Sequence, residues 1–198
     1  KEMVEFREKE FLDRREVVQS LLAERENCLV VSGLGSPTYD VHAAGDRDEN
    51  FYLWGGMGGA SMIGLGLAIA QPQKTIIVIT GDGEQLMGIG SLSTIGILKP
   101  KNLLIIVLDN EHFGETGMQK SHTFHAVDLA RIASASGCPK SILVSDKSSL
   151  VELLKIKKTL SCFTFAVIKV SQSTAPRSLP MVEGVKIQKR FRRSLGLK

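Results

Sequence analysis

Long apolar runs recur along the chain, separated by segments with a helical pattern. The two strongest runs are TIIVIT at 75–80 and LLIIVL at 103–108, where β-branched residues and leucines follow one another without a polar break. Such runs are typical of strands in a parallel sheet whose two faces are both covered. The segments 28–32, 142–144 and 163–170 are apolar enough to predict three further strands.

Between the predicted strands the composition favours helices. We expect helices at 2–25, 60–70, 86–98, 127–136 and 148–158, and loops at 33–40 and 111–125. Strands that alternate with helices imply right-handed crossovers, and therefore an α/β fold with a doubly wound, mostly parallel sheet and helices on both faces. We expect residues 1–170 to form this domain, and residues 171–198 to be a basic C-terminal tail without a clear period.

Composition narrows the class of protein. Hydrophobic residues make up 43% of the 198 residues and charged residues 23%, which is ordinary for a soluble globular protein. No apolar run reaches membrane-spanning length, so no membrane partner is expected. Cys28, Cys138 and Cys162 lack metal-site spacing and lie beside apolar residues, which predicts buried, inert thiols. Because the charged start also lacks the apolar core of a signal peptide, we expect a cytoplasmic protein.

The positive net charge belongs to the tail. The chain has 25 Lys and Arg against 21 Asp and Glu, and residues 171–198 hold seven of the basic and one of the acidic residues. Subtraction leaves 18 basic and 20 acidic residues in 1–170, a net charge of −2. A solvated or partner-docking arm is favoured over binding of nucleic acid or acidic lipid, because IQKRFRRSLGLK holds one aromatic residue and matches no nucleic-acid-binding fold. Tail arginines that reach an anionic substrate are a further alternative.

Oxygen-bearing side chains follow the two strongest strands. Asp82 stands between Gly81 and Gly83 after the first strand, and Asn110 ends the second. Both offer the hard oxygen ligands that Mg²⁺ takes, and the glycines let the backbone approach a bulky anion. Gly-Asp-Gly alone is also common turn chemistry. Asn110, 28 positions after Asp82 at the next strand end, favours a joint metal–diphosphate site.

The segment GDGEQLMGIGSLSTIGILKPKNLLIIVLDN resembles the cofactor signature of thiamine-diphosphate enzymes, with Asp109 where the pattern usually has its first Asn. The flanking WGGMGGASMIGLGLAIAQP and DNEHFGETGMQ are similar to the C-terminal halves of phosphonopyruvate decarboxylase and to the β subunit of sulfopyruvate decarboxylase. This resemblance covers about residues 28–170. It implies two cofactors, thiamine diphosphate and Mg²⁺.

Carried over by position, the resemblance assigns roles to individual residues. The side chains of Asp82 and Asn110 and the carbonyl of His112 would bind Mg²⁺, and the amides of Gly83 and Glu84 would serve the phosphates. Met57 would support the bent cofactor and, with His112, line the reacting centre. The implied cofactor-binding residues are Gly33, Ser36, Gly55, Met57, Gly81, Asp82, Gly83, Glu84, Asn110 and Gly114.

The implied reaction is decarboxylation of a small anionic 2-oxo acid, similar to sulfopyruvate or phosphonopyruvate, to an aldehyde. These enzymes hold the cofactor between two domains, and 198 residues leave no room for the second one. We therefore expect a separate pyrimidine-binding subunit that carries an activating glutamate, in a hetero-oligomer of α₂β₂ type or larger. The family's carboligases and 2-oxo acid dehydrogenase subunits remain alternatives, as does a non-catalytic phosphate-binding module with a basic interaction tail.

The histidines near the second strand end have two open interpretations. His112, His122 and His125 either bind substrate and move protons or are exposed loop residues. Their spacing does not predict a zinc site, because no fourth ligand accompanies them. The role of His42 is open.

Overall fold

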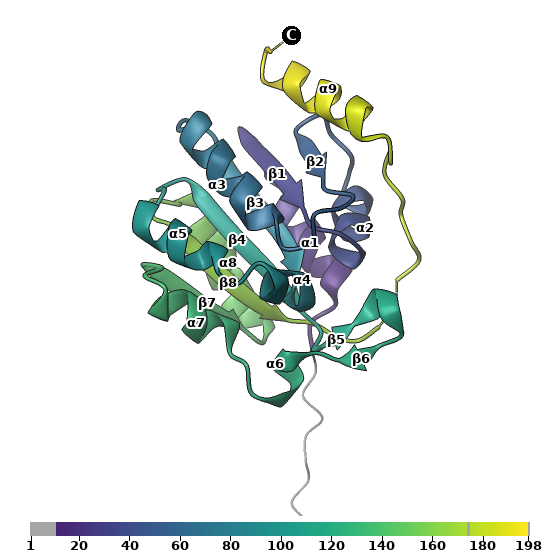
Figure 1. Cartoon of the computed structure of the whole chain (residues 1–198), viewed down its shortest axis with the longest axis vertical. Coiled ribbons are helices and arrows are strands. Elements are labelled where there is room, and N and C mark those ends of the chain that lie inside the picture. The colour runs from purple at the N-terminus through teal and green to yellow at the C-terminus, as the bar shows by residue number, and fades with distance from the viewer. Residues whose placement is uncertain (1–10, 174, 198) are drawn as a thin grey trace, which may run out of the picture.

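A six-stranded parallel sheet forms the centre of the chain (Figure 1). This computed structural model describes residues 11–173 and 175–197. The strand order is β2-β1-β3-β4-β8-β7, and every neighbouring pair is parallel. The strands are β1 (Cys28–Ser32), β2 (Asn50–Tyr52), β3 (Thr75–Gly81), β4 (Leu103–Asp109), β7 (Lys140–Val144) and β8 (Thr164–Lys169). The predicted doubly wound α/β fold is confirmed.

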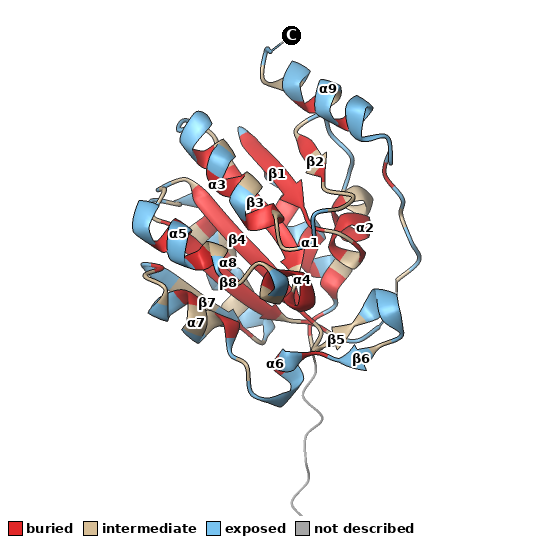
Figure 2. Ribbon diagram, in the orientation of Figure 1, coloured by how far each residue is buried: buried red, intermediate tan, exposed pale blue. Residues whose placement is uncertain are grey.

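Helices cover both faces of the sheet. One face packs against α1 (Arg14–Leu22), α2 (Ser36–Ala43) and α8 (Lys147–Lys158), and the other against α3 (Ala60–Ala70), α5 (Ser91–Leu98) and α7 (Leu129–Ala135). Figure 2 shows the strands buried between two helical layers whose outer surfaces are exposed. Burial on both faces explains why the strand sequences have no polar break.

The residues of β4 divide between two cores. Leu104 and Ile106 belong to the core under α1 and α8, whereas Leu103, Ile105 and Val107 belong to the core under α3, α5 and α7. All five side chains are fully buried. Successive side chains of a strand point to opposite faces, so a strand in this position must be apolar throughout.

The chain reverses its direction of winding at β1. From β1 it runs through α2 to β2 on one side, and from β2 through α3 to β3 on the other side. The loops after β1 and β3 therefore diverge at the carboxyl ends of these two adjacent strands. A crevice at such a switch point is the usual ligand site of an open α/β sheet.

Several predicted boundaries were wrong. The segment 33–40, expected as a loop, contains the start of α2, with Pro37 in its first turn. The helix expected at 86–98 is two helices, α4 (Asp82–Met87) and α5, separated at 88–90. A Cβ on Gly88 would lie 2.0 Å from the carbonyl oxygen of Gly58, so a close approach of two backbones sets this break. Strand β2 was not predicted.

The first predicted helix and the second predicted loop also differ. Of the helix predicted at 2–25, residues 2–10 lie outside the described part, and in the remainder α1 spans only Arg14–Leu22. The segment 111–125 contains short elements: β5 (His112–Phe113), η1 (Gly114–Thr116), β6 (Gln119–Lys120) and α6 (His122–His125). Strands β5 and β6 pair as a small antiparallel hairpin beyond the end of β4 (Figure 1).

The segment 171–198 contains a helix that sequence analysis missed. Helix α9 (Gly184–Ser194) buries Ile187 and Phe191, and the Phe191 ring lies edge-on to Phe51 with 5.5 Å between centroids. Figure 1 shows α9 beside β2 at the edge of the sheet. The many basic residues of this segment hid its apolar period. Two buried side chains four positions apart are nevertheless enough to dock one face of a helix.

The predicted burial of the cysteines is confirmed for Cys28 and Cys138 and wrong for Cys162, which is half-buried because it lies just before β8; all three thiols are free. Among the described residues, no helix has the length and apolar character needed to span a bilayer.

Candidate functional site

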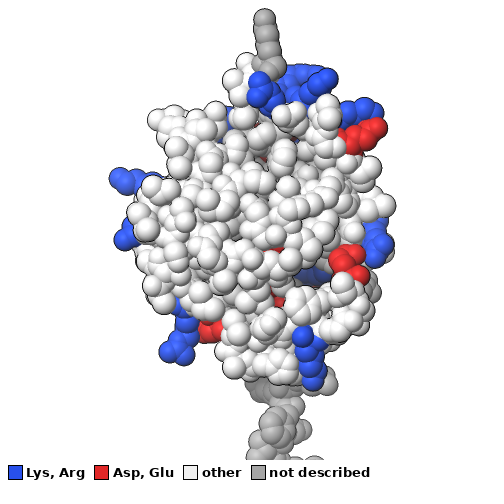
Figure 3. Space-filling view, viewed as in Figure 1, with Lys and Arg blue, Asp and Glu red and all other residues white. Residues whose placement is uncertain are grey.

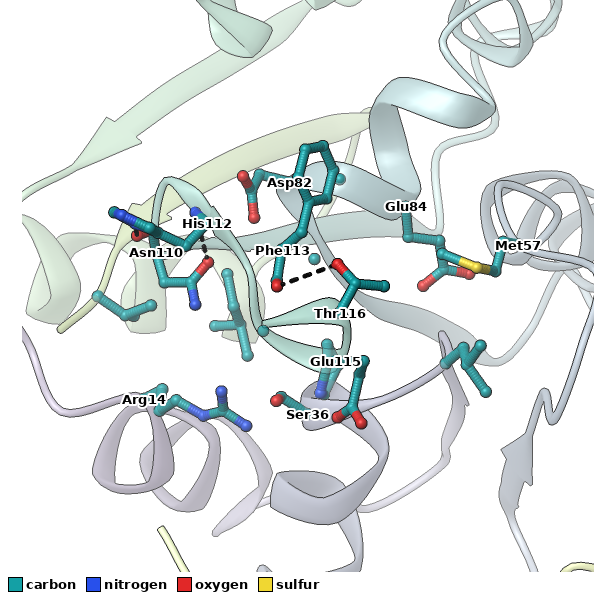
Figure 4. Close-up of a pocket in the computed structure, with 17 residues that line it drawn as sticks. Arg14, Ser36, Met57, Asp82, Glu84, Asn110, His112, Phe113, Glu115 and Thr116 are labelled. Atoms are coloured by element: carbon teal, nitrogen blue, oxygen red, sulfur yellow. Dashed lines mark hydrogen bonds between the residues drawn. The ribbon is translucent and has the colours of Figure 1, made fainter. Parts of the chain in front are cut away.

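A pocket lies at the carboxyl ends of β1, β3 and β4, at the switch point of the sheet (Figure 4). It is lined by Arg14, Leu34, Ser36, Pro37, Met57, Gly81, Asp82, Gly83, Glu84, Leu108, Asn110, His112, Phe113, Gly114, Glu115, Thr116 and Val170. The lining thus combines the start of α1, the turns after β1 and β3, and the hairpin after β4. Met57 from the loop before α3 and Val170 after β8 complete the lining. These segments, distant in sequence, meet here because parallel strands end at the same edge of a sheet.

Most of the predicted site residues lie in this pocket. Ser36, Met57, Gly81, Asp82, Gly83, Glu84, Asn110, His112 and Gly114 all line it. Gly33 and Gly55 are not among the lining residues. Gly33 instead makes room for a neighbour, because a Cβ on it would lie 1.7 Å from Oε2 of Glu84. Gly55 has no atom within 4 Å of the position of a Cβ.

Asp82 is the most buried acid of the pocket, at 2% exposure. Its Oδ2 accepts hydrogen bonds from the hydroxyls of Ser121 and, at 3.2 Å, Thr123. Burial raises the pKa of Asp82, and nearby Asp109 raises it further, whereas the hydroxyl hydrogen bonds lower it. A divalent cation would favour the charged carboxylate against this burial, so the site suits a metal ligand.

Asn110 and His112 form the opposite wall of the same end of the pocket. Asn110 Oδ1 accepts a hydrogen bond from the His112 amide at 3.1 Å, and His112 Nδ1 lies 3.0 Å from the Asn110 carbonyl oxygen. Figure 4 shows Asp82, Asn110 and His112 from three positions around one space. No group of three His, Cys, Asp or Glu side chains that could hold a metal exists among the described residues. One carboxylate, one amide oxygen and one backbone carbonyl are hard ligands of the kind that suits Mg²⁺.

Glycine at position 83 is required by a close contact. A Cβ there would lie 2.6 Å from the ring of Phe113, which comes from the hairpin after β4. Gly83 and Glu84 occupy the first turn of α4, where backbone amides have no acceptor within the helix. These amides can donate to an anion in the pocket.

The side chain of Glu84 is a feature that sequence analysis missed. It is 5% exposed, and its Oε2 accepts a hydrogen bond from Thr80 at 2.7 Å. Burial raises the pKa of Glu84, and the hydrogen bond from Thr80 and the amides of Gly58 and Leu34 oppose this rise. Glu84 therefore lies beside Gly33 in the turn after β1 and near the loop before α3, which contains Gly58. Met57, in that loop, is 45% exposed at the mouth of the pocket.

Arg14 is the second residue that sequence analysis missed. It opens α1 with a side chain that is 10% exposed, and its Nε donates to Oδ2 of the fully buried Asp40 at 2.8 Å. Arg15 Nε lies 3.2 Å from the other oxygen of the same carboxylate. No local sequence pattern indicates this ion-pair cluster, because Arg14 and Asp40 are 26 positions apart and α2 was not predicted.

The histidines separate in the structure. His112 lines the pocket, whereas His122 and His125 are not among the lining residues. The His122 ring lies edge-on to Phe113, with 6.3 Å between centroids. His42 Nδ1 lies 2.8 Å from the Ser178 hydroxyl, and this contact joins α2 to the segment after β8.

Comparison with known proteins gives one family. The family model described as "Thiamine pyrophosphate enzyme, C-terminal TPP binding domain" matches residues 38–170. Sulfopyruvate decarboxylase of Methanosarcina acetivorans is 35% identical over 192 residues, which are 96% of this chain and 49% of the relative. Sulfopyruvate decarboxylase subunit beta of Methanocaldococcus jannaschii is 47% identical over 112 residues, 57% of this chain and 59% of the relative. The chain therefore spans about half the length of these curated relatives.

One further relative and one solved structure are also similar to this chain. Phosphonopyruvate decarboxylase of Streptomyces viridochromogenes is 41% identical over 121 residues, 61% of this chain and 30% of the relative. The crystal structure of a thiamin diphosphate-dependent enzyme from Mycobacterium smegmatis superposes with a TM-score of 0.70 at 20% identity, over 82% of this chain and 32% of that one. At this identity the superposition supports the fold alone.

Proposed function

The chain belongs to the thiamine pyrophosphate enzymes, and we propose that it is the diphosphate-binding half of a decarboxylase that converts a small anionic 2-oxo acid to an aldehyde. One observation carries this proposal: Asp82 and Asn110, which follow adjacent strands, line one pocket with Met57 at its mouth. Relatives named for sulfopyruvate and phosphonopyruvate decarboxylation point to a 2-oxo acid that bears a second anionic group.

The residues at the two adjacent strand ends have distinct roles in this proposal. Asp82 and Asn110 bind Mg²⁺ through their side chains, and His112 binds it through its carbonyl oxygen. The amides of Gly83 and Glu84 hold the diphosphate oxygens. Gly81 has no side chain and so lets the diphosphate approach the backbone. This donor set fits a magnesium diphosphate because it offers neutral and anionic oxygens to the metal and amides to the phosphate.

The remaining residues orient the cofactor. Ser36 and Gly114 lie across the pocket from the turn after β3, and Gly33 gives Glu84 the room to reach it. Gly55 and Met57 contact the aminopyrimidine through a carbonyl, an amide and the methionine side chain. Bound thiamine diphosphate supplies the electron sink for loss of carbon dioxide.

His112 has a second role in substrate handling. A carbonyl oxygen can only accept, so the 3.0 Å contact with Asn110 O places the proton on Nδ1 of the ring. The other ring nitrogen, Nε2, then carries a lone pair in the neutral ring and is left to accept a hydrogen bond or a proton from the substrate. Met57 covers the reacting centre and excludes water from it.

A partner subunit completes the site. In Figure 3 the middle of the face over α3, α4 and α5 is largely free of Lys, Arg, Asp and Glu, which gather around the rim. The exposed large apolar side chains of these helices are Met62, Ile69, Met87, Ile97 and Leu98. We assign this surface, called here the α3–α5 face, to a separate subunit that carries the pyrimidine-binding domain and an activating glutamate, in an α₂β₂ or larger assembly.

Two further assignments follow from the proposal. The cofactor-binding domain ends near residue 170, where the family match ends, and 171–198 is a basic extension fastened to it through α9. Three free thiols fit a cytoplasmic enzyme, because reducing conditions keep thiols in this state.

Calorimetric titration of thiamine diphosphate with Mg²⁺ tests the proposal, with the partner subunit present. We expect binding to the unchanged chain, no measurable binding to Asp82→Ala, and unchanged binding to Asp128→Ala. Asp128 is the matched control, because it caps α7 outside the pocket. Unaltered binding to Asp82→Ala contradicts the metal assignment, and conversion of sulfopyruvate to its aldehyde by the complex tests the reaction.

A further inference from the structure

Arg14 brings a cation to the pocket that the proposed metal and diphosphate ligands do not include. Its side chain is 10% exposed and lines the pocket together with Asn110, Ser36 and Glu115. In Figure 4 the guanidinium group points toward the space between Asn110 and Ser36. Burial of a cation is costly unless a partner offsets it, so this position needs an explanation.

The partner of Arg14 satisfies only part of its guanidinium group. Nε donates to Asp40 Oδ2 at 2.8 Å, and no hydrogen bond from Nη1 or Nη2 to another described residue occurs. Asp40 is shared, because its Oδ1 also accepts from Arg15 Nε at 3.2 Å. Two arginines on one carboxylate leave a positive charge of one at this end of the pocket. The free edge of the Arg14 guanidinium group, formed by Nη1 and Nη2, presents coplanar N–H donors that can bind two oxygens of one oxyanion.

The acids of the pocket do not neutralise this charge. Glu115, across from Arg14, lies 3.4 Å from Arg177, and no ion pair joins Glu115 to Arg14 among the described residues. Asp82 accepts hydrogen bonds from Ser121 and Thr123 on the other side of the pocket. Glu84 accepts one from Thr80 and lies near Met57, away from Arg14 (Figure 4). The charge of Arg14 is therefore available to a bound anion.

The position of Arg14 indicates which anion it binds. Figure 4 shows Met57 at one end of the pocket and Arg14, Asn110 and His112 at the other. Under the proposed function, on which this inference rests, Met57 marks the aminopyrimidine end of the cofactor. We infer that the free edge of Arg14 binds the terminal phosphate of the diphosphate, on the side away from Asp82, and that Asp40 holds Arg14 in position.

A comparison of two thiamine phosphates tests this inference. Affinities for thiamine diphosphate and thiamine monophosphate are measured by calorimetry with Mg²⁺ and the partner subunit present. We expect Arg14→Met to weaken binding of the diphosphate about tenfold to a hundredfold, the effect of a charge-assisted hydrogen bond. Binding of the monophosphate, which lacks the terminal phosphate, is expected to stay the same.

Two further variants separate binding from folding. Arg15→Met is the matched control, because Arg15 pairs with the same carboxylate but does not line the pocket. It is expected to keep both affinities. In Arg14→Met the buried Asp40 carboxylate keeps only Arg15 as a partner. The double variant Arg14→Met/Asp40→Asn removes this carboxylate, so we expect its thermal stability to exceed that of Arg14→Met while its diphosphate affinity stays low.

The outcomes distinguish this inference from the proposed function. If the unchanged complex binds thiamine diphosphate and Arg14→Met binds it equally well, the inference is wrong and the proposed function stands. Recovery of full diphosphate affinity in the double variant would show that Arg14 is structural. If Arg14→Met weakens both phosphates equally, the residue does not contact the terminal phosphate. If the unchanged complex fails to bind thiamine diphosphate, the proposed function falls as well.

Discussion

Lys169 at the end of β8 donates to Asp109 at the end of β4, with 2.7 Å between Nζ and Oδ2. Lys169 also donates to Glu111 at 2.6 Å, and Thr123 donates to the other oxygen of Asp109 at 2.7 Å. Burial lowers the pKa of Lys169, but the two carboxylates outweigh this and raise it. The aspartate that departs from the cofactor signature thus joins the end of β8 to the loop that supports Asp82.

Breaking this ion pair is expected to destabilise the fold. Lys169→Met leaves a carboxylate that is 2% exposed without its cation, which should lower the free energy of unfolding by about 3–5 kcal/mol. Lys169→Met/Asp109→Asn removes both charges, so we expect it to recover much of the loss. Urea denaturation of the three chains measures these differences. Equal stability of Lys169→Met and the unchanged chain would refute the structural role.

Helix α5 depends on a glycine where it meets α7. A Cβ on Gly96 would lie 1.8 Å from the carbonyl oxygen of Ser136, so Gly96→Ala is expected to lower the free energy of unfolding by about 1–3 kcal/mol. Gly66, within α3, has no atom within 4 Å of such a Cβ. Gly66→Ala should therefore be neutral or stabilising by about 0.5–1 kcal/mol. Thermal or urea denaturation checks both, and a stable Gly96→Ala would argue against this helix contact.

The docking of α9 is expected to depend on pH. Arg190 donates to both oxygens of Asp46, at 2.6 and 3.0 Å, and Tyr52 donates to one of them at 2.8 Å. Burial raises the pKa of Asp46, but these hydrogen bonds together outweigh it and hold the pKa below 3.8. A carboxyl whose pKa falls on folding stabilises the folded state above its ordinary pKa, and this stabilisation is lost as the pH falls through the lowered value.

Asp46→Asn should therefore be less stable than the unchanged chain by about 1 kcal/mol near neutral pH, as is usual for a partly exposed ion pair. The difference is expected to shrink below pH 3.8 and then disappear. Urea denaturation over a pH series measures it. Asp48→Asn is the control, because Asp48 is 3.8 Å from Arg190 and more exposed. A difference that persists at the acid end would contradict the assigned cause.

The α3–α5 face is expected to bind the partner subunit. Ile97, on α5, is 81% exposed, so Ile97→Glu should leave the chain folded but weaken assembly by at least about tenfold, because an interface would bury an unpaired charge. Val151 is 52% exposed on α8, which covers the other face of the sheet. Val151→Glu should assemble normally. Co-elution in size-exclusion chromatography measures both, and normal assembly of Ile97→Glu would exclude this surface.

The sequence by itself determined the sheet and the approach of the strand ends. Uninterrupted apolar runs are stable only where both faces are covered, so β1, β3 and β4 could be located before their partners were known. Parallel strands end at one edge, so Asp82 and Asn110 could be expected to meet. The bounds of α3 at 60–70 agree with prediction because the composition of the segment is almost entirely apolar.

Tertiary structure alone decided the features that depend on distant partners. Helix α2 forms from a segment rich in turn residues, and its Asp40 pairs with Arg14 of α1. Helix α9 buries Ile187 and Phe191 at the sheet edge beside β2, a strand of three residues that the pattern did not reveal. Arg14 enters the pocket because α1 packs beside α2. Local propensity carries no information about such contacts, since their free energy comes from residues far apart in the chain.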